Sequence, residues 1–71
     1  MIHEYETDIR ALQRDLKTIE KKIKAKEKEL YASHTARPRR AVLRSELKVL
    51  DMEYRETVRQ IQQLEEDISN I

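Results

Sequence analysis

The chain has no cysteine, which removes several kinds of chemistry at once. Disulfides, thiolate nucleophiles and cysteine-based zinc sites are all excluded. The sequence also has no apolar run approaching the roughly 20 residues that span a bilayer, and its first residues lack the apolar stretch of a secretory signal. We therefore expect a cytoplasmic protein with no membrane partner.

Glycine is absent, proline occurs once, and the only aromatic residues are three tyrosines. A chain built from many short strands and tight turns needs more of all three types. Charged residues make up 41% of the sequence and hydrophobic residues 38%. This balance is typical of long helices or a coiled coil, and the length of 71 residues suits one small domain with a marginal core.

Apolar residues recur at alternating spacings of three and four along two segments, as at the a and d positions of a coiled-coil heptad. Only Lys26 and Thr57 break this pattern, and they are candidates for fixing the register and the number of partners. The full set is Ile2, Tyr5, Ile9, Leu12, Leu16, Ile19, Ile23, Lys26 and Leu30, followed by Leu43, Leu47, Leu50, Tyr54, Thr57, Ile61, Leu64, Ile68 and Ile71.

The two segments fit each other when the chain folds back at residues 36–37. Every a position then faces a d position, with Ile9 opposite Leu64 and Ile23 opposite Leu50. The sequence therefore predicts an all-α, antiparallel two-helix hairpin of the coiled-coil type that forms a single domain over residues 1–71. We expect the first helix at about 2–32, the turn at about 33–37 and the second helix at about 36–70.

The stretch between the two segments holds the residues expected to shape the turn. Pro38 fits the first turn of a helix, where its missing N–H has no intrahelical partner. Thr35 is a candidate N-cap for the second helix. Because no glycine is available to end the first helix, His34 is expected to adopt the left-handed conformation.

A lone hairpin buries only one row of side chains on each helix, so the sequence favours further association into a homodimeric four-helix bundle. Several flanking charges also repel inside the hairpin, such as Glu20 against Asp51. Small residues at heptad position c would let another helix approach closely. The candidate interface is Ala11, Ala25, Ala32, Val42 and Val49. A stable monomer, a hetero-complex and a longer intermolecular coiled coil stay open as alternatives.

Charge is distributed unevenly along the rod. Residues 21–52, the half that contains the turn, hold ten basic and four acidic residues, a net charge of +6, whereas the other residues hold five basic and ten acidic ones, a net charge of −5. The candidate binding surface at the turn, here called the basic tip, comprises Lys22, Lys28, Arg37, Arg39, Arg40 and Arg44. Three explanations stay open: simple solvation, an acidic protein partner, and nucleic-acid phosphates.

No group of residues predicts catalysis, a cofactor, a metal ion or a small-molecule substrate. His3 and His34 are expected at opposite ends of a hairpin roughly 45 Å long. No glycine-rich phosphate loop or His-Glu-x-x-His sequence is present. The sequence thus predicts a non-enzymatic interaction or regulatory protein that binds a protein partner as a homodimer, with nucleic-acid binding through the basic tip as the alternative.

Overall fold

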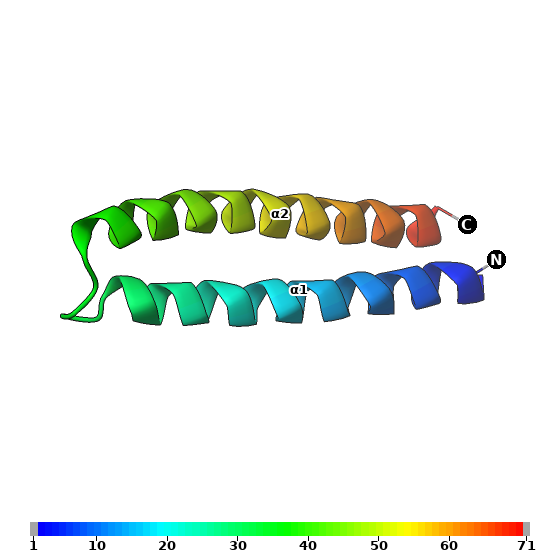
Figure 1. The fold of residues 1–71 in the computed structure, drawn as a ribbon. Helices are drawn as coiled ribbons and strands as arrows, with labels where there is room; N and C mark the ends of the chain where they lie inside the picture. Colours follow the sequence, from blue (N-terminus) through cyan, green and yellow to red (C-terminus); the bar gives the residue numbers. More distant parts are fainter. Residues whose placement is uncertain (1, 71) are drawn as a thin grey trace.

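The computed structural model describes residues 2–70, with side chains from Glu4 to Asn70. It contains two helices, α1 (Ile2–Leu30) and α2 (Arg37–Ser69), and no strand between residues 2 and 70. The helices lie antiparallel and side by side, and the start of α1 and the end of α2 are at the same end of the molecule (Figure 1). The prediction of an all-α antiparallel hairpin is therefore confirmed.

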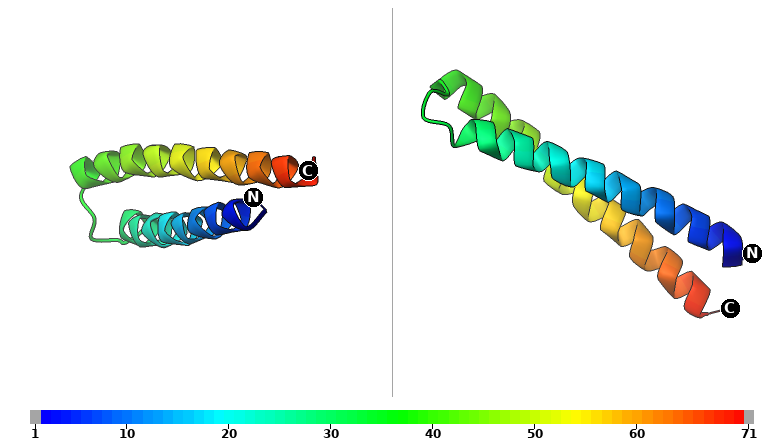
Figure 2. Two further views of the ribbon diagram at one scale, coloured as in Figure 1. Left: turned by 90° about the vertical axis from the view of Figure 1, so that its right-hand side faces the viewer. Right: turned by 90° about the horizontal axis from the view of Figure 1, so that it is seen from below.

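The hairpin is a narrow rod that measures 53 × 15 × 11 Å. Figure 2 shows that α1 and α2 cross at a small angle and stay adjacent from the turn to their free ends. Such a shape has no interior beyond the contact between its two helices. Most side chains of the protein therefore lie on the outer surface of the two helices.

The core is the single row of a and d residues that the heptad pattern predicts. Leu43 is fully buried, and Ile19, Leu30, Leu50 and Ile61 are also buried. The remaining a and d residues between positions 5 and 68 are half-buried, as expected when only one helix covers each of them. The expected contact between Ile2 and Ile71 lies outside the described side chains.

The two polar residues of this row are accommodated differently. Lys26 forms an ion pair with Glu46 of α2, which ties the two helices together across the seam. The Thr57 hydroxyl instead donates to the Glu53 carbonyl oxygen of its own helix at 2.8 Å. Lys26 can therefore help to fix the register of the hairpin, whereas the Thr57 hydroxyl makes no bond across it.

The turn differs from the sequence prediction in how α1 ends. No described residue has a positive φ, so the expectation of a left-handed His34 is wrong. The chain leaves the helix through short turn hydrogen bonds, from the Ala32 N–H to the Glu29 carbonyl at 3.2 Å and from the Thr35 N–H to the Ala32 carbonyl at 3.2 Å. These tight bonds satisfy carbonyl groups at the helix end without a left-handed residue.

The start of α2 differs as well. Its N-cap is Ala36, which offers no side-chain cap, so the prediction that Thr35 caps this helix is wrong. The Thr35 hydroxyl donates instead to the Glu29 carbonyl oxygen at 2.5 Å and thereby serves the end of α1. Pro38 lies in the first turn of α2, as predicted.

Candidate functional site

One long face of the hairpin carries three shallow grooves in succession, and we call it the groove face. It is built from heptad positions c, d and g of both helices, together with Met52. From the open end to the turn, the grooves are lined by Asp8, Ala11, Leu12, Asp15, Thr18, Ile19, Lys22 and Lys26 of α1 and by Leu64, Gln63, Gln60, Thr57, Glu56, Glu53, Met52, Leu50, Val49 and Glu46 of α2.

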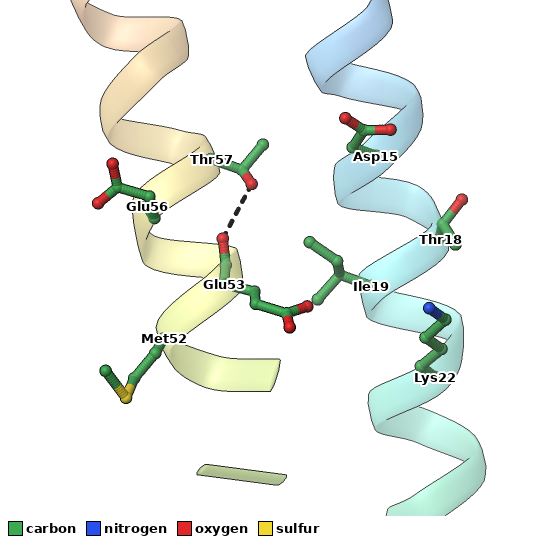
Figure 3. Close-up of a pocket in the computed structure, with 8 residues that line it drawn as sticks. All are labelled: Asp15, Thr18, Ile19, Lys22, Met52, Glu53, Glu56 and Thr57. Carbon is green, nitrogen blue, oxygen red and sulfur yellow. Dashed lines mark hydrogen bonds between the residues drawn. The ribbon is translucent and has the colours of Figure 1, made fainter. Parts of the chain in front are cut away.

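The central groove shows how the groove face is made (Figure 3). Ile19 and the Glu53 carboxylate point into the space between the helices, whereas Met52 and Glu56 point away from it. The Thr18 hydroxyl donates to the Arg14 carbonyl oxygen of its own helix at 3.1 Å. Since the hydroxyls of Thr18 and Thr57 are both used within their own helices, the groove floor offers mainly apolar surface to a partner.

Four of the five predicted interface residues lie on or beside this face, whereas Ala32 lies in the turn because α1 ends at Leu30 and not at about residue 32 as predicted. Ala11 and Val49 line the grooves, and Ala25 is exposed on the same side of α1, one heptad beyond Thr18. Val42 and Val49 keep 47% and 54% of their surface exposed, while Ala32 in the turn is half-buried. An oligomer interface at these residues stays a prediction.

Sequence reasoning missed Met52, which is 70% exposed at the edge of the central groove. Its heptad position, f, is usually the most solvated one, so the pattern gave no reason to select it. A large exposed apolar side chain beside a groove is nevertheless typical of contact surfaces. Met52 therefore extends the apolar surface of the groove face toward the outside of α2.

Charge is separated along the groove face. In the half nearest the chain ends, every charged side chain at the c and g positions is acidic, whereas the half nearest the turn carries three cations and two acids. The acidic residues of the first half are Glu4, Asp8, Asp15, Glu53, Glu56 and Asp67, and the charged residues of the second are Lys22, Lys26, Glu29, Arg39 and Glu46.

At the turn, Glu29 and Glu46 connect α1 and α2. The Arg39 guanidinium binds Glu29 with two hydrogen bonds, from Nε at 2.5 Å and from Nη2 at 3.1 Å, and lies 3.9 Å from Glu46. The hydrogen bond from Arg39 and its positive charge lower the pKa of the Glu29 carboxyl below its usual value of 4.5. The same hydrogen bond and the charge of Glu29 raise the pKa of Arg39. This arrangement joins the end of α1 to the start of α2.

The basic tip is therefore not one uniform set of free cations. Arg39 is engaged with carboxylates, and Arg40 is half-buried and donates to the Ala32 carbonyl oxygen at 3.4 Å. The remaining members, Lys22, Lys28, Arg37 and Arg44, are exposed and take part in none of the ion pairs found between residues 4 and 70. Binding of a partner at the tip stays a prediction that depends mainly on these four.

Neither helix has a segment long and apolar enough to cross a membrane within the described residues. The same part of the chain contains no cluster of three or more His, Asp or Glu side chains arranged to hold a metal ion. Comparison with protein-family models, with curated proteins and with solved structures found no match to this chain.

Proposed function

We propose that this chain is a small, non-enzymatic coiled-coil interaction protein of the cytoplasm, which acts by binding protein partners and works as a homodimer. The observation that carries the proposal is the groove face, with its apolar floor and its exposed Val42, Val49 and Met52. A second copy of the chain is the occupant that we propose for this face, and the two hairpins then form a four-helix bundle.

The exposed area supports association. The hairpin exposes 5912 Å², whereas a compact monomer of its mass, 8.6 kDa, exposes about 4,700 Å². The excess of about 1,200 Å² is larger than the roughly 800 Å² that each partner buries in a standard protein interface. Pairing along the groove face would bring the exposed area of each chain close to that of an ordinary folded domain.

The distribution of charge favours one orientation of the pair. Parallel hairpins would place the acidic half of one groove face against the acidic half of the other, and these like charges would repel. In an antiparallel pair, each acidic half instead meets the half nearest the turn, where Lys22 is exposed and three cations face two acids, a net charge of +1. We therefore propose a dimer in which the turn of each hairpin lies beside the chain ends of its partner.

The basic tip supplies a second contact surface in this arrangement. Lys28, Arg37 and Arg44 occupy heptad positions e and f, away from the groove face, so the dimer leaves them exposed. Exposed cations of this kind attract acidic protein surfaces and accelerate association. We propose that the tip recruits an acidic protein partner while the groove face holds the dimer together.

The experiment that tests the proposal compares two double variants by sedimentation equilibrium at micromolar concentration. Ala25→Glu with Val49→Glu adds two charges to the groove face and should reduce the dimerisation constant at least tenfold, because buried unpaired charges are costly. Ala41→Glu with Ser45→Glu adds the same charge on the outer surface of α2 and should leave the dimer intact. Equal effects of the two variants, or a monomeric parent protein, would refute the groove-face dimer.

A further inference from the structure

The outer face of α1 carries an uninterrupted row of cations, which we call the α1 basic row. Its members are Arg10, Arg14, Lys17, Lys21, Lys24 and Lys28. They are spaced alternately by four and three residues, so they follow one face of the helix over about 27 Å. All six are exposed, and none belongs to the ion pairs found between residues 4 and 70.

The corresponding face of α2 is different. Its cations are Lys48, Arg55 and Arg59, and two of these are paired within the helix, Arg55 with Asp51 at 3.2 Å and Arg59 with Glu56 at 4.0 Å. On this face, only the neutral residues Pro38, Ala41 and Ser45 lie between the start of α2 and Lys48. If these charges served only to keep the helices soluble, both outer faces should carry similar sets of cations. Solubility alone therefore does not account for the α1 basic row.

The row is electrostatically unfavourable for the hairpin alone. Each cation lies three or four residues from the next, and like charges at these spacings destabilise a helix. Glu6, Glu20 and Glu27 border the row on one side, but the Glu20 carboxylate accepts a hydrogen bond from the Tyr54 hydroxyl of α2 at 3.4 Å and so is directed toward the other helix. A polyanion along the row would relieve the repulsion.

Tyr31 continues the row three residues beyond Lys28, and 80% of its surface is exposed. Its backbone N–H still bonds to the Glu27 carbonyl at 3.0 Å, which keeps the residue in line with the helix. An exposed aromatic ring at the end of a line of cations is the combination that binds single-stranded nucleic acids, in which phosphates meet the charges and an unpaired base stacks on the ring.

Other polyanions fit this surface less well. An acidic protein would find no apolar residue at heptad positions b and f from Arg10 to Lys28, and protein interfaces normally have an apolar centre. An anionic membrane would need apolar side chains to insert, but the apolar row of α1 is packed against α2. We propose that the α1 basic row and Tyr31 bind single-stranded RNA or DNA, on a surface that lies outside the groove face and shares only Lys28 with the basic tip.

The test uses fluorescence anisotropy of a labelled oligodeoxythymidylate and of an oligouridylate, each about 16 nucleotides long, titrated with the full chain. The parent protein should bind at about 50 mM salt and lose affinity steeply toward about 200 mM. The triple variant Lys17→Gln, Lys21→Gln, Lys24→Gln should bind at least tenfold more weakly. Its slope of log affinity against log salt should be shallower by about 2, since each single-strand contact contributes about 0.7.

Two matched variants separate the row from total charge. Lys48→Gln, Arg55→Gln, Arg59→Gln removes the same charge from the outer face of α2 and should reduce affinity much less. Replacing Lys17, Lys21 and Lys24 by arginine keeps the charge and should preserve binding. Circular dichroism should show unchanged helicity in all three triple variants, because the substituted side chains are exposed.

The aromatic contact has its own variant. Tyr31→Ala should weaken binding of the oligonucleotides roughly 5- to 150-fold, the range expected for loss of one stacked base. It should affect a duplex of the same length much less, because bases in a duplex are not free to stack on the ring.

Three results would overturn the proposal. The first is no binding of either oligonucleotide at about 50 mM salt, where electrostatic affinity is high. The second is an equal loss of affinity in the two glutamine variants. The third is binding to phosphatidylserine vesicles without any binding to the oligonucleotides.

Discussion

Leu43 is the side chain whose truncation should cost the hairpin most. It is the one fully buried side chain among the described residues, and it packs next to the turn, where the two helices first meet. Leu43→Ala removes about 2.4 kcal/mol of transfer free energy at ~0.8 kcal/mol per carbon. The cavity that remains raises the expected loss to about 3–5 kcal/mol.

That loss is large for a protein of this size. At about 0.05–0.15 kcal/mol per residue, the whole chain has a free energy of unfolding of about 4–11 kcal/mol. Leu43→Ala should therefore lower the melting temperature by about 12 °C or more, since each kcal/mol shifts it by about 4–8 °C in small domains. Thermal and urea unfolding, followed by circular dichroism at one fixed protein concentration, measure both quantities.

Two control variants show how the loss of stability depends on the burial of the truncated side chain. Leu47→Ala, at the neighbouring and half-buried seam position, should cost about half as much. Gln62→Ala, on the same helix but exposed and outside the groove face, should stay within about 0.5 kcal/mol. A loss for Leu43→Ala no greater than that for Gln62→Ala would show that the helices are not packed together near the turn.

Three further predictions concern the polar contacts. In a double-mutant cycle with Lys26→Gln and Glu46→Gln, the coupling energy from urea unfolding should be about 0.2–1 kcal/mol, as for other partly exposed ion pairs. Thr35→Val should cost about 1 kcal/mol, measured by the same method, because the Glu29 carbonyl loses its hydroxyl donor. The folded pKa of Glu29 lies below its unfolded pKa, so its stabilisation is present above about 4.5 and lost as pH falls through the folded pKa. Glu29→Gln should flatten the decline of stability in that acid range.

The heptad pattern was sufficient to predict the hairpin because every apolar residue at an a or d position has to be buried against the other helix. Burial of one face demands alternating spacings of three and four, so many residues specify the same helix and the same register. A single exception such as Lys26 does not change this, since its long side chain reaches a carboxylate on α2. The fold could therefore be predicted because many residues indicate the same arrangement.

The turn could not be predicted in the same way, because its contacts depend on the backbone conformation of a few residues. A hydroxyl such as that of Thr35 can bond either to N–H groups that follow it or to carbonyls that precede it. The choice depends on backbone angles that the sequence does not specify, and here Thr35 bonds backward to Glu29. The contact of Arg39 with Glu29 likewise exists only once the turn has brought the two helix ends together.

Candidate surfaces were predictable to different degrees. The small residues of the groove face share a heptad position, so their common side followed from helical geometry. The loss of Arg39 and Arg40 as free cations did not follow, because their partners are set by the turn. The net charges of the basic and the acidic half are sums over all faces of both helices. The α1 basic row becomes visible only when the charges on each face are counted separately.

The distance between the two turns in the assembled protein tests the antiparallel groove-face dimer most directly. Because the chain has no cysteine, Ser33→Cys places one spin label in the exposed turn of each copy. Pulsed electron paramagnetic resonance should then give an interchain distance close to the rod length of 53 Å. A distance within about two helix diameters, or roughly 25 Å, would mean a parallel pair, and no dipolar signal at micromolar concentration would mean a monomer; either result contradicts the proposed dimer.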